Sequence, residues 1–589
     1  MKGSDTDIFN FMVVTSHYIV PIYQRNYSWG QDQCATLYED MLKLHEKRQA
    51  NKDLGVNLSH FIGSVVYQFD NDPTSQPGKY LIDGQQRVIT MYLFYLALLR
   101  AAQQGTAKDQ AIAPRLQISL LENLQGSHRF SLSSKADQDA MDKLFAGNED
   151  EYDPDSRLTQ NYNYFFKRLK SEKKLTLAEM FGLTEHLSFV QIALDKDDDA
   201  QLIFESVNSK GLYLSHGEKV KNFVLMGISP SQAQKSYTKQ WYPLELNCKA
   251  AEGEYGLDNF IFYYLTIKFS ELPEFGKLYD EFKKFYQNCG LDKIKLVEEM
   301  NKYSELFRRV KSCSYKLYPT WDTDLSNAER KSMQTAIELE LKRLTYFPYE
   351  RHIPFVMQIM WLHLQHQISA AELLESLKLV EVFYLRRWTY GVPTNTLNRF
   401  FATLYAEVNA VNADEAGNDF ISKLKFVLRS ERARVPNDTQ FEEAFKNCDF
   451  YSNANTSLLC YVLERLENFE HREPLHIMDE LEKDKKAYTI EHVMPQNLTP
   501  EWCAELGPNA EALHELWKDR IANLTLTAYN STLSDRPFAE KRDMPNGYKD
   551  SILRLTKSIA AHEHWNEEDL KQRATELSEM ALKIWPYPA

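Results

Sequence analysis

The sequence predicts a multidomain α+β protein that is predominantly helical. Its 589 residues are too many for a single hydrophobic core, so two or three domains are expected. The central stretch, residues 229–479, follows a mostly helical pattern, whereas β-prone runs gather near the N-terminus and again after residue 487. We therefore expect an α/β domain at residues 1–228, a helical connecting region at 229–389 and a mixed domain at 390–589.

The first region alternates helical and β-prone segments. A helical pattern from Gln31 to about Arg48 is followed by the β-prone run Phe61–Phe69 and a turn rich in Pro, Gly, Ser, Asn and Asp. A second short strand, Lys79–Asp83, leads into an apolar run from Val88 to Leu99. This run is too short to span a bilayer and contains tyrosines, so we expect a buried helix.

The segment Asp83-Gly-Gln-Gln-Arg87 predicts a strand-to-helix corner. Gly84 lets the backbone turn without a Cβ, and the free N–H groups of the helix start form an anion site that Arg87 could complete. Asp83 could bind a ribose hydroxyl or a metal. The residues expected around one nucleotide pocket are Asp83, Gly84, Gln85, Gln86, Arg87, Gln24 and Arg25. A polar helix cap without a ligand explains the same composition, and both readings stay open here.

Two later segments favour structural roles. A helix from Asp198 is expected to end near Asn208, with Gly211 as its C-cap. The basic and aromatic segment Arg386–Gly391 could contact nucleic acid, but we favour a packing corner between helices.

The segment Tyr488–Gln496 carries the strongest chemical signal. Its β-prone start is followed directly by the adjacent residues Glu491 and His492. A second β-prone run, Arg520–Leu526, leads to Asn530. An isolated Glu-His pair more often ends a core strand, but the order of strand, loop, strand and helix favours a hydrolytic site. Because neighbouring strand residues point to opposite faces, Glu491 and His492 can share one site only if a turn or bulge begins there.

Phosphodiester hydrolysis explains why these residue types are needed. It takes a base to deprotonate water and a hard cation to neutralise developing charge. His492 fits the base, because an unperturbed imidazole is largely neutral at cellular pH. The expected ligands of Mg²⁺ or Mn²⁺ are Glu491, His492 and Asn530. Asn523 is expected to hold the loop or the imidazole in place.

The net charge and the cysteine content narrow the class of protein further. The net charge of −14 argues against a surface coated for nucleic-acid binding, although basic residues gather near the candidate site. We expect Arg520, Lys541 and Arg542 to contact DNA phosphates. The seven cysteines include no CxxC pair, and the first residues do not form a signal peptide, which favours a reduced cytoplasmic protein without a membrane association.

The chain resembles two families of domains. Pro21–Trp29, Asp83–Thr90 and Ala200–Ser215 resemble the DUF262 family, whose core is ParB/sulfiredoxin-like, and residues from about Tyr390 resemble the DUF1524 family of HNH nucleases, with a ββα-metal core at about 485–560. Their combination is similar to GmrSD-type modification-dependent restriction endonucleases and to nucleases that sense phosphorothioated DNA.

The resemblance implies an NTP-regulated endonuclease or nickase acting against phages in a prokaryotic cytoplasm. ATP or GTP would bind the Asp83 corner, modified double-stranded phage DNA would be the substrate, and a homodimer is one expected assembly. His492, Asn523 and Asn530 would form the catalytic triplet. Tyr23, Tyr27 and Trp29 could sense the modification or simply staple the N-terminal segment to its domain. Two alternatives stay open: a ParB-like, nucleotide-gated DNA-binding protein with an inactive HNH domain, and an RNase or toxin.

Overall fold

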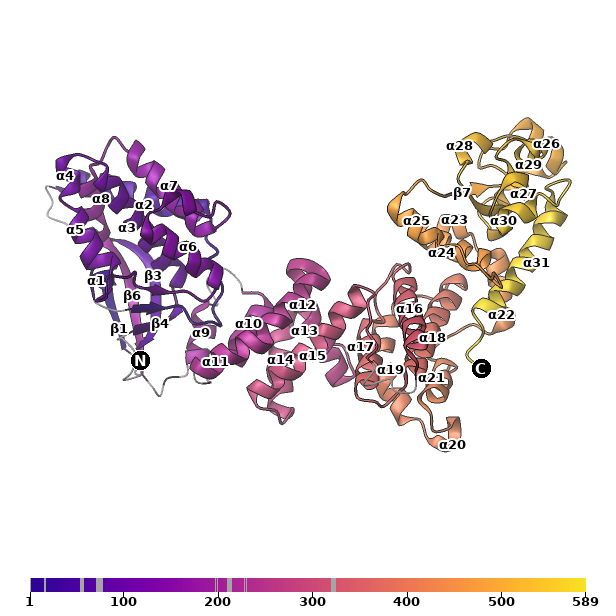
Figure 1. Cartoon of the computed structure of the whole chain (residues 1–589), viewed down its shortest axis with the longest axis horizontal. Helices are drawn as coiled ribbons and strands as arrows, with labels where there is room; N and C mark the ends of the chain where they lie inside the picture. Colours follow the sequence, from indigo (N-terminus) through magenta and orange to yellow (C-terminus); the bar gives the residue numbers. More distant parts are fainter. Residues whose placement is uncertain are drawn as a thin grey trace. The chain divides into compact units, whose positions relative to one another are not determined.

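The computed structural model describes residues 2–14, 17–52, 58–69, 78–195, 198, 200–208, 214–226, 228, 230–318 and 325–589, which are predominantly helical (Figure 1). The chain divides into two compact units, Met1–Glu245 with Tyr286–Asn301 and Leu246–Phe285 with Lys302–Ala589. The boundaries expected at residues 228 and 389 remain predictions. Within the described ranges, no helix combines the length and apolarity that crossing a membrane requires.

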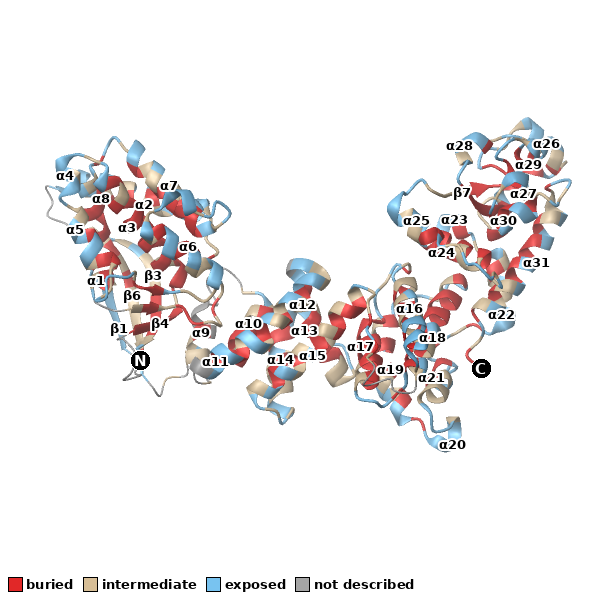
Figure 2. Cartoon of the chain, in the orientation of Figure 1, coloured by how far each residue is buried: buried red, intermediate tan, exposed pale blue. Residues whose placement is uncertain are grey.

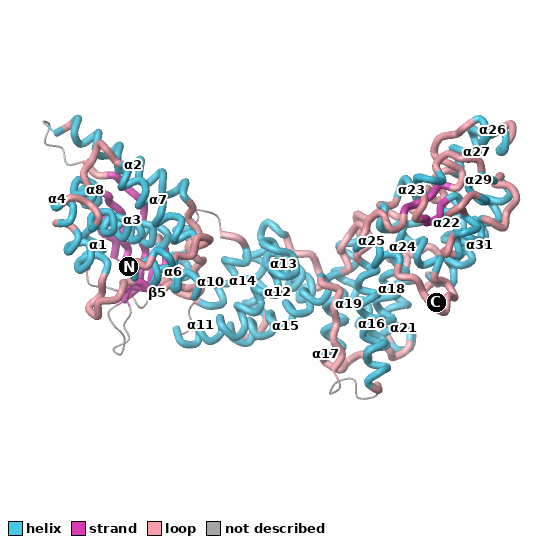
Figure 3. The backbone as a smooth tube through the Cα atoms, turned by 45° about the horizontal axis from the view of Figure 1, so that its top comes forward, coloured by secondary structure: helices cyan, strands magenta, loops and turns pink. Residues whose placement is uncertain are grey.

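A mixed sheet forms the centre of the first unit, and the described residues contribute six strands to it (Figure 3). In sheet order the strands are β1 (Lys2–Asp7), β6 (Leu187–Leu194), β3 (His60–Phe69), β4 (Gly78–Asp83), β2 (His17–Ile19) and β5 (Phe130–Ser131). Strand β3 runs parallel to β6 and antiparallel to β4, which lies parallel to β2. The two strands expected around residues 61–69 and 79–83 are confirmed.

Helix α3 (Gln85–Gln103) is the core helix of the first unit. Its residues from Val88 to Leu99 are all buried, as the apolar run predicted (Figure 2). The helix packs on α7 (Arg157–Ser171), where the rings of Phe94 and Phe165 meet edge to face at 5.5 Å. The helix expected from Gln31 is also confirmed as α2 (Gln31–Ala50).

Further helices surround these elements. In the first part of the chain they include α1 (Ile8–Val13), α6 (Lys135–Ala146), α8 (Leu177–Leu183), α9 (Ala200–Asn208), α10 (His216–Leu225) and α11 (Pro230–Ser236). Helix α9 ends at Asn208 as expected, while Gly211, the expected C-cap, lies outside the described residues.

The region expected to be mostly helical is so in its described ranges. Its longer helices are α12 (Tyr242–Glu252), α13 (Gly256–Phe269), α14 (Leu278–Asn288), α15 (Lys293–Lys311), α16 (Asn327–Leu344), α17 (Ile353–Leu364), α18 (Ala370–Thr389), α19 (Leu397–Ala410), α21 (Phe420–Leu428), α22 (Asp438–Asn447) and α24 (Thr456–Glu467). Arg386 on α18 is fully buried and donates to the carbonyls of Trp585 (2.8 Å) and Pro436 (3.0 Å). The packing interpretation of this basic segment is therefore confirmed.

The last part of the chain contains a two-stranded antiparallel sheet, β7 (Thr489–His492) with β8 (Leu524–Thr527). Short helices follow each strand: α26 (Pro500–Leu506), α27 (Ala510–Trp517), α28 (Asn530–Leu533), α29 (Phe538–Asp543) and α30 (Arg554–Ile559), with the long α31 (Glu567–Ile584) after them. Trp502, Trp565 and Phe538 belong to one buried cluster, which also contains Val493 and Met494 just after β7. The strands lie where the two β-prone runs predicted them.

Gly84 gives a first test of this fold. It turns the chain from β4 into α3 with φ +84°, and a Cβ at this position would lie 2.7 Å from the carbonyl oxygen of Ser64. We expect Gly84→Ala to lower the free energy of unfolding by about 1–3 kcal/mol in chemical denaturation.

Gly182→Ala is the matched control, because Gly182 lies within α8 and a Cβ there meets nothing within 4 Å. This substitution should be neutral or stabilising by up to about 1 kcal/mol. Equal stability of the Gly84→Ala variant and the wild type would contradict the strained turn.

Candidate functional site

His492 lies at the end of β7, which pairs with β8 in an unbroken register from Thr489↔Thr527 to His492↔Leu524. The regular pairing keeps the alternation of a strand, so Glu491 and His492 point to opposite faces. No bulge interrupts the pairing, and the strand gives way to bends at Val493 and Met494 directly after His492. The metal set of Glu491, His492 and Asn530 remains a prediction.

His492 instead faces an acidic partner that sequence reasoning missed. Its Nε2 lies 3.6 Å from Oδ1 of Asp519, and its ring meets the ring of Tyr451 edge to face, with 4.4 Å between centroids. Ser452 donates its hydroxyl proton to the Asp519 carboxylate, and the Tyr451 amide donates to the Asp519 carbonyl at 3.1 Å. These contacts join α23 (Phe450–Asn453) to the segment before β8.

Only part of this arrangement has a signal in the sequence. Asp519 immediately precedes Arg520, the start of the second β-prone run, so its proximity to the strand could have been inferred. Tyr451 and Ser452 lie about forty residues before His492, inside a helical region, and no motif marks them.

Burial controls the protonation state of His492. It lowers the pKa of the imidazole to about 4, outweighing the negative charge of Asp519, which raises it. The positive charges of Lys541 and His514 lower the pKa further. At neutral pH the ring is uncharged and has one basic nitrogen. Nε2 is buried and lies 3.6 Å from Asp519, which is longer than a hydrogen bond. The tautomer with its proton on Nε2 faces Asp519 and leaves the lone pair on Nδ1.

Glu491 and Lys541 form a buried ion pair on the other face of β7. The Lys541 ammonium is fully buried and donates to Glu491 Oε1 (2.7 Å) and to the carbonyls of His492 (2.9 Å) and Val493 (3.2 Å). Tyr548 also donates to Glu491 Oε1, at 2.9 Å. The expectation that Lys541 contacts a DNA phosphate is wrong, because its helix α29 turns it into the core and all three of its protons have acceptors.

Asn523 and Asn530 both hold backbone in place. Asn523 is fully buried, and its amide donates to the carbonyls of Met494 (2.8 Å) and Lys518 (3.0 Å) while accepting from the Met494 amide (2.8 Å). It thereby fixes the chain on both sides of the His492–Asp519 pair. Asn530 donates to the carbonyl of Ile490 at 2.7 Å, at the edge of β7. Holding the loop was one of the two roles expected for Asn523.

The two arginines expected to contact phosphate have different surroundings. The Arg520 guanidinium stacks 4.8 Å from the Trp517 ring, next to the site, whereas Arg542 pairs with Asp543 at 2.6 Å and donates to the His562 carbonyl. Across the described ranges, no three His, Cys, Asp or Glu side chains gather in a way that could hold a metal ion.

The glutamines of the Asp83 corner are structural. Gln86 accepts from the Ser28 amide (2.8 Å) and donates to the Asn26 carbonyl (3.2 Å), and Gln24 donates to the Ile82 carbonyl (2.8 Å). Gln85 donates to the Arg25 carbonyl at 3.3 Å, which leaves its buried Oε1 without a partner. These bonds fasten the segment around residues 24–29 to the start of α3. Gln24 and Gln86 also line the corner cavity, so their contact with a nucleotide remains a prediction.

Asp83, Arg25 and Arg87 surround a cavity of about 270 Å³ in front of the α3 N-terminus. Arg87 lies 4.0 Å from Asp83 and donates to the Ser64 carbonyl at 2.9 Å, yet its side chain remains about one third exposed. Burial raises the pKa of Asp83, and the charge of Arg87 opposes that rise. Two arginines and the N-terminus of α3 give the corner the groups that a phosphate requires.

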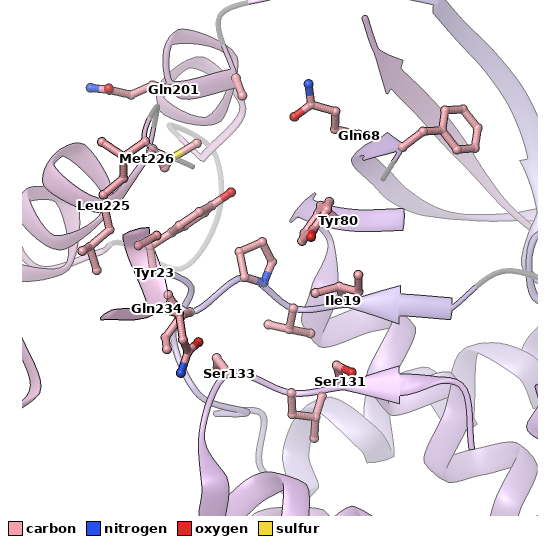
Figure 4. Close-up of a pocket in the computed structure, with 18 of the residues that line it drawn as sticks. Ile19, Tyr23, Gln68, Tyr80, Ser131, Ser133, Gln201, Leu225, Met226 and Gln234 are labelled. Atoms are coloured by element: carbon pink, nitrogen blue, oxygen red, sulfur yellow. The ribbon is translucent and has the colours of Figure 1, made fainter. Parts of the chain in front are cut away.

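The three expected sensing residues separate in space. Tyr27 is buried, and its hydroxyl forms hydrogen bonds with Thr90 (2.7 Å) and Asn161 (2.9 Å). It therefore fastens its segment to α3 and α7, and the sensing role predicted for it is wrong. Trp29 borders the corner cavity. Tyr23 lines another cavity of about 730 Å³, beside Tyr80 and Met226 (Figure 4).

Two family models match the chain. The N-terminal domain of the GmrSD restriction endonuclease matches residues 6–225, and the C-terminal domain of these enzymes matches residues 435–580. The chain belongs to the GmrSD-like family. A search of curated proteins finds no match.

The GmrSD-like match covers both candidate sites. The N-terminal range contains the Asp83 corner, and the C-terminal range contains His492, Asp519 and Tyr451. Restriction endonuclease domains at both ends make the chain a restriction-type nuclease, with DNA as the substrate class that this family implies.

The buried ion pair under β7 gives a stability prediction. Lys541→Met removes the ammonium and leaves the Glu491 carboxylate buried without its cation, so the free energy of unfolding should fall by about 3–5 kcal/mol in chemical denaturation. Lys549→Met is the control, because Lys549 is more than half exposed and pairs with Asp543 at the surface. It should change stability by less than about 1 kcal/mol. Equal effects of both substitutions would contradict the role given to Lys541.

A second prediction concerns the charge of His492. Because burial holds its pKa at about 4, the imidazole should stay neutral as the pH falls through 6 and 5, and should take up a proton only near pH 4. Nitrogen NMR of protein labelled at histidine measures this titration, and the His492→Gln spectrum assigns the signal. Titration near pH 6.5 would show that the ring is not buried as described.

Proposed function

We propose that this chain is an NTP-regulated, modification-dependent DNA endonuclease or nickase of the HNH type. The observation that carries the proposal is the neutral His492 imidazole, 3.6 Å from the Asp519 carboxylate, inside a domain matched by the GmrSD C-terminal model. It is the arrangement of a general base with an orienting carboxylate, which hydrolysis of a phosphodiester requires.

The chemistry follows from the two side chains. His492 Nδ1 accepts a proton from water as the water oxygen attacks the DNA phosphorus. The bond from phosphorus to the 3′ oxygen then breaks, which gives a 5′-phosphate and, after protonation, a 3′-hydroxyl. Asp519 stabilises the imidazolium formed during the attack. Binding of Mg²⁺ or Mn²⁺ is proposed from the chemistry of the reaction, since such a cation neutralises charge on the phosphate when bound.

Nucleotide regulation is proposed from the Asp83 corner. Arg25, Arg87 and the α3 N-terminus suit a nucleotide phosphate, and hydrolysis of ATP or GTP there would control DNA cleavage. The cavity lined by Tyr23 suits a chemical modification on phage DNA. Control has a physical motive in a prokaryotic cytoplasm, because an unrestrained nuclease would cut the host chromosome. A homodimer is the assembly we propose.

A nicking assay tests the proposal. Supercoiled plasmid DNA, unmodified or carrying glucosylated hydroxymethylcytosine or phosphorothioate, is incubated with Mg²⁺ and NTP. His492→Ala should lower the nicking rate by at least about 100-fold, because it removes the base. Asp519→Asn should lower it about 10- to 100-fold while nucleotide hydrolysis continues. Arg87→Ala should abolish the hydrolysis.

The outcomes separate the alternatives. Full nicking by His492→Ala would show that the base is wrong. Absence of cleavage on every DNA would favour a nucleotide-gated DNA-binding protein with an inactive nuclease domain. Cleavage of RNA but not DNA at equal salt would indicate an RNase.

A further inference from the structure

A second cavity adjoins the Asp83 corner. It has a volume of about 310 Å³ and lies between α2, β3 and α3. It shares three lining residues with the corner cavity, namely Trp29, Gln33 and Arg87. Arg87 therefore stands at the junction of a polar cavity and a more apolar one.

The second cavity is lined by aromatic side chains that suit a planar ring. Trp29 forms its border toward the corner, and Phe61 on β3 is 62% exposed, which is unusual for a phenylalanine. The pairing of β3 with β6 shifts register between Phe61 and Ser64. In this irregular stretch Gly63 has φ +112°, and a Cβ there would lie 3.0 Å from the Arg87 guanidinium. The irregularity thus makes room for Arg87 at the junction.

One acidic side chain lies in this apolar cavity. Asp40 comes from the α2 face that also presents Gln33, Thr36 and Leu37. Its carboxylate lies 3.6 Å from Lys43 and 3.5 Å from His60, so both contacts are longer than a close ion pair, and its side chain is one quarter exposed. The carboxylate keeps acceptor capacity for a ligand.

We propose that this cavity binds the guanine base of GTP, with the phosphates in the adjoining Asp83 corner. The inference rests on the proposed nucleotide regulation and names its substrate. Guanine presents two adjacent donors, N1–H and the N2 amino group, which match the two oxygens of one carboxylate. Adenine presents one donor, N6–H, beside the acceptor N1, which repels the second oxygen. Asp40 therefore selects guanine, while Trp29 and Phe61 contact the ring faces.

In this arrangement Arg87 contacts two parts of the bound nucleotide, the sugar and the first phosphate. It stands between base and phosphates, where the sugar and the first phosphate of a bound nucleotide would lie, and its guanidinium is partly exposed there.

Calorimetric titration of the full chain with GTP, ATP and XTP tests this inference. The wild type should bind GTP at least about 10-fold more tightly than ATP, since a bidentate contact discriminates by that much. Asp40→Asn should lose this preference and bind XTP more tightly than GTP, because the asparagine amide donates to the 2-oxygen of xanthine. Asp32→Asn is the matched control, since Asp32 is an exposed acid on the same helix that does not line the cavity.

The outcomes distinguish the guanine site from nucleotide regulation in general. A switch to XTP in Asp40→Asn alone supports the guanine site, because a merely structural role for Asp40 would weaken all three nucleotides together. Equal binding of GTP and ATP by the wild type, unchanged in Asp40→Asn, overturns this inference but leaves nucleotide regulation standing. Absence of binding by any nucleotide to the wild type overturns both.

Discussion

The buried ammonium of Lys541 fixes the geometry on which the candidate nuclease site depends. It binds Glu491 and the carbonyls of His492 and Val493, at the end of β7 and just after it. Such a pair costs desolvation energy, and its value lies in specifying one arrangement of the strand. Because Glu491 is held on this face, His492 must point to the opposite one, toward Asp519 and Tyr451.

Burial and charge then act on His492 in opposite directions. Burial keeps the imidazole neutral, and Asp519 makes its positive form less unfavourable. A base needs both effects, because it must start without a proton and must stabilise the proton once it arrives. Asn523 keeps the two side chains in register by holding the carbonyls of Met494 and Lys518, which flank them in the chain.

Local pattern predicted the elements well. The buried helix α3, the strands β3, β4, β7 and β8, and the glycine turn at Gly84 follow from apolar runs and turn residues whose signals are short-range. The site was predicted only in part. His492 ends β7 as expected, but the regular pairing of β7 keeps its alternation, so Glu491 points to the other face of the strand.

The remaining differences arise from contacts between distant segments. Lys541 carries a charge that pattern assigns to the surface, yet it faces an acid fifty residues away in the sequence. Likewise, Gln24 and Gln86 resembled ligand-binding groups, and they also bond backbone brought close by folding. The partners Tyr451 and Ser452 reach His492 from a helical region with no motif. No local pattern encodes such pairings.

Chemical rescue tests most directly whether His492 is the base. The His492→Gly variant is assayed for nicking with imidazoles of increasing basicity added to the solution. The inactive variant should regain cleavage in proportion to the concentration and basicity of the imidazole, with Asp519 required for the largest gain. Cleavage by His492→Gly without any imidazole, at the rate of the wild type, would show that His492 is not the base.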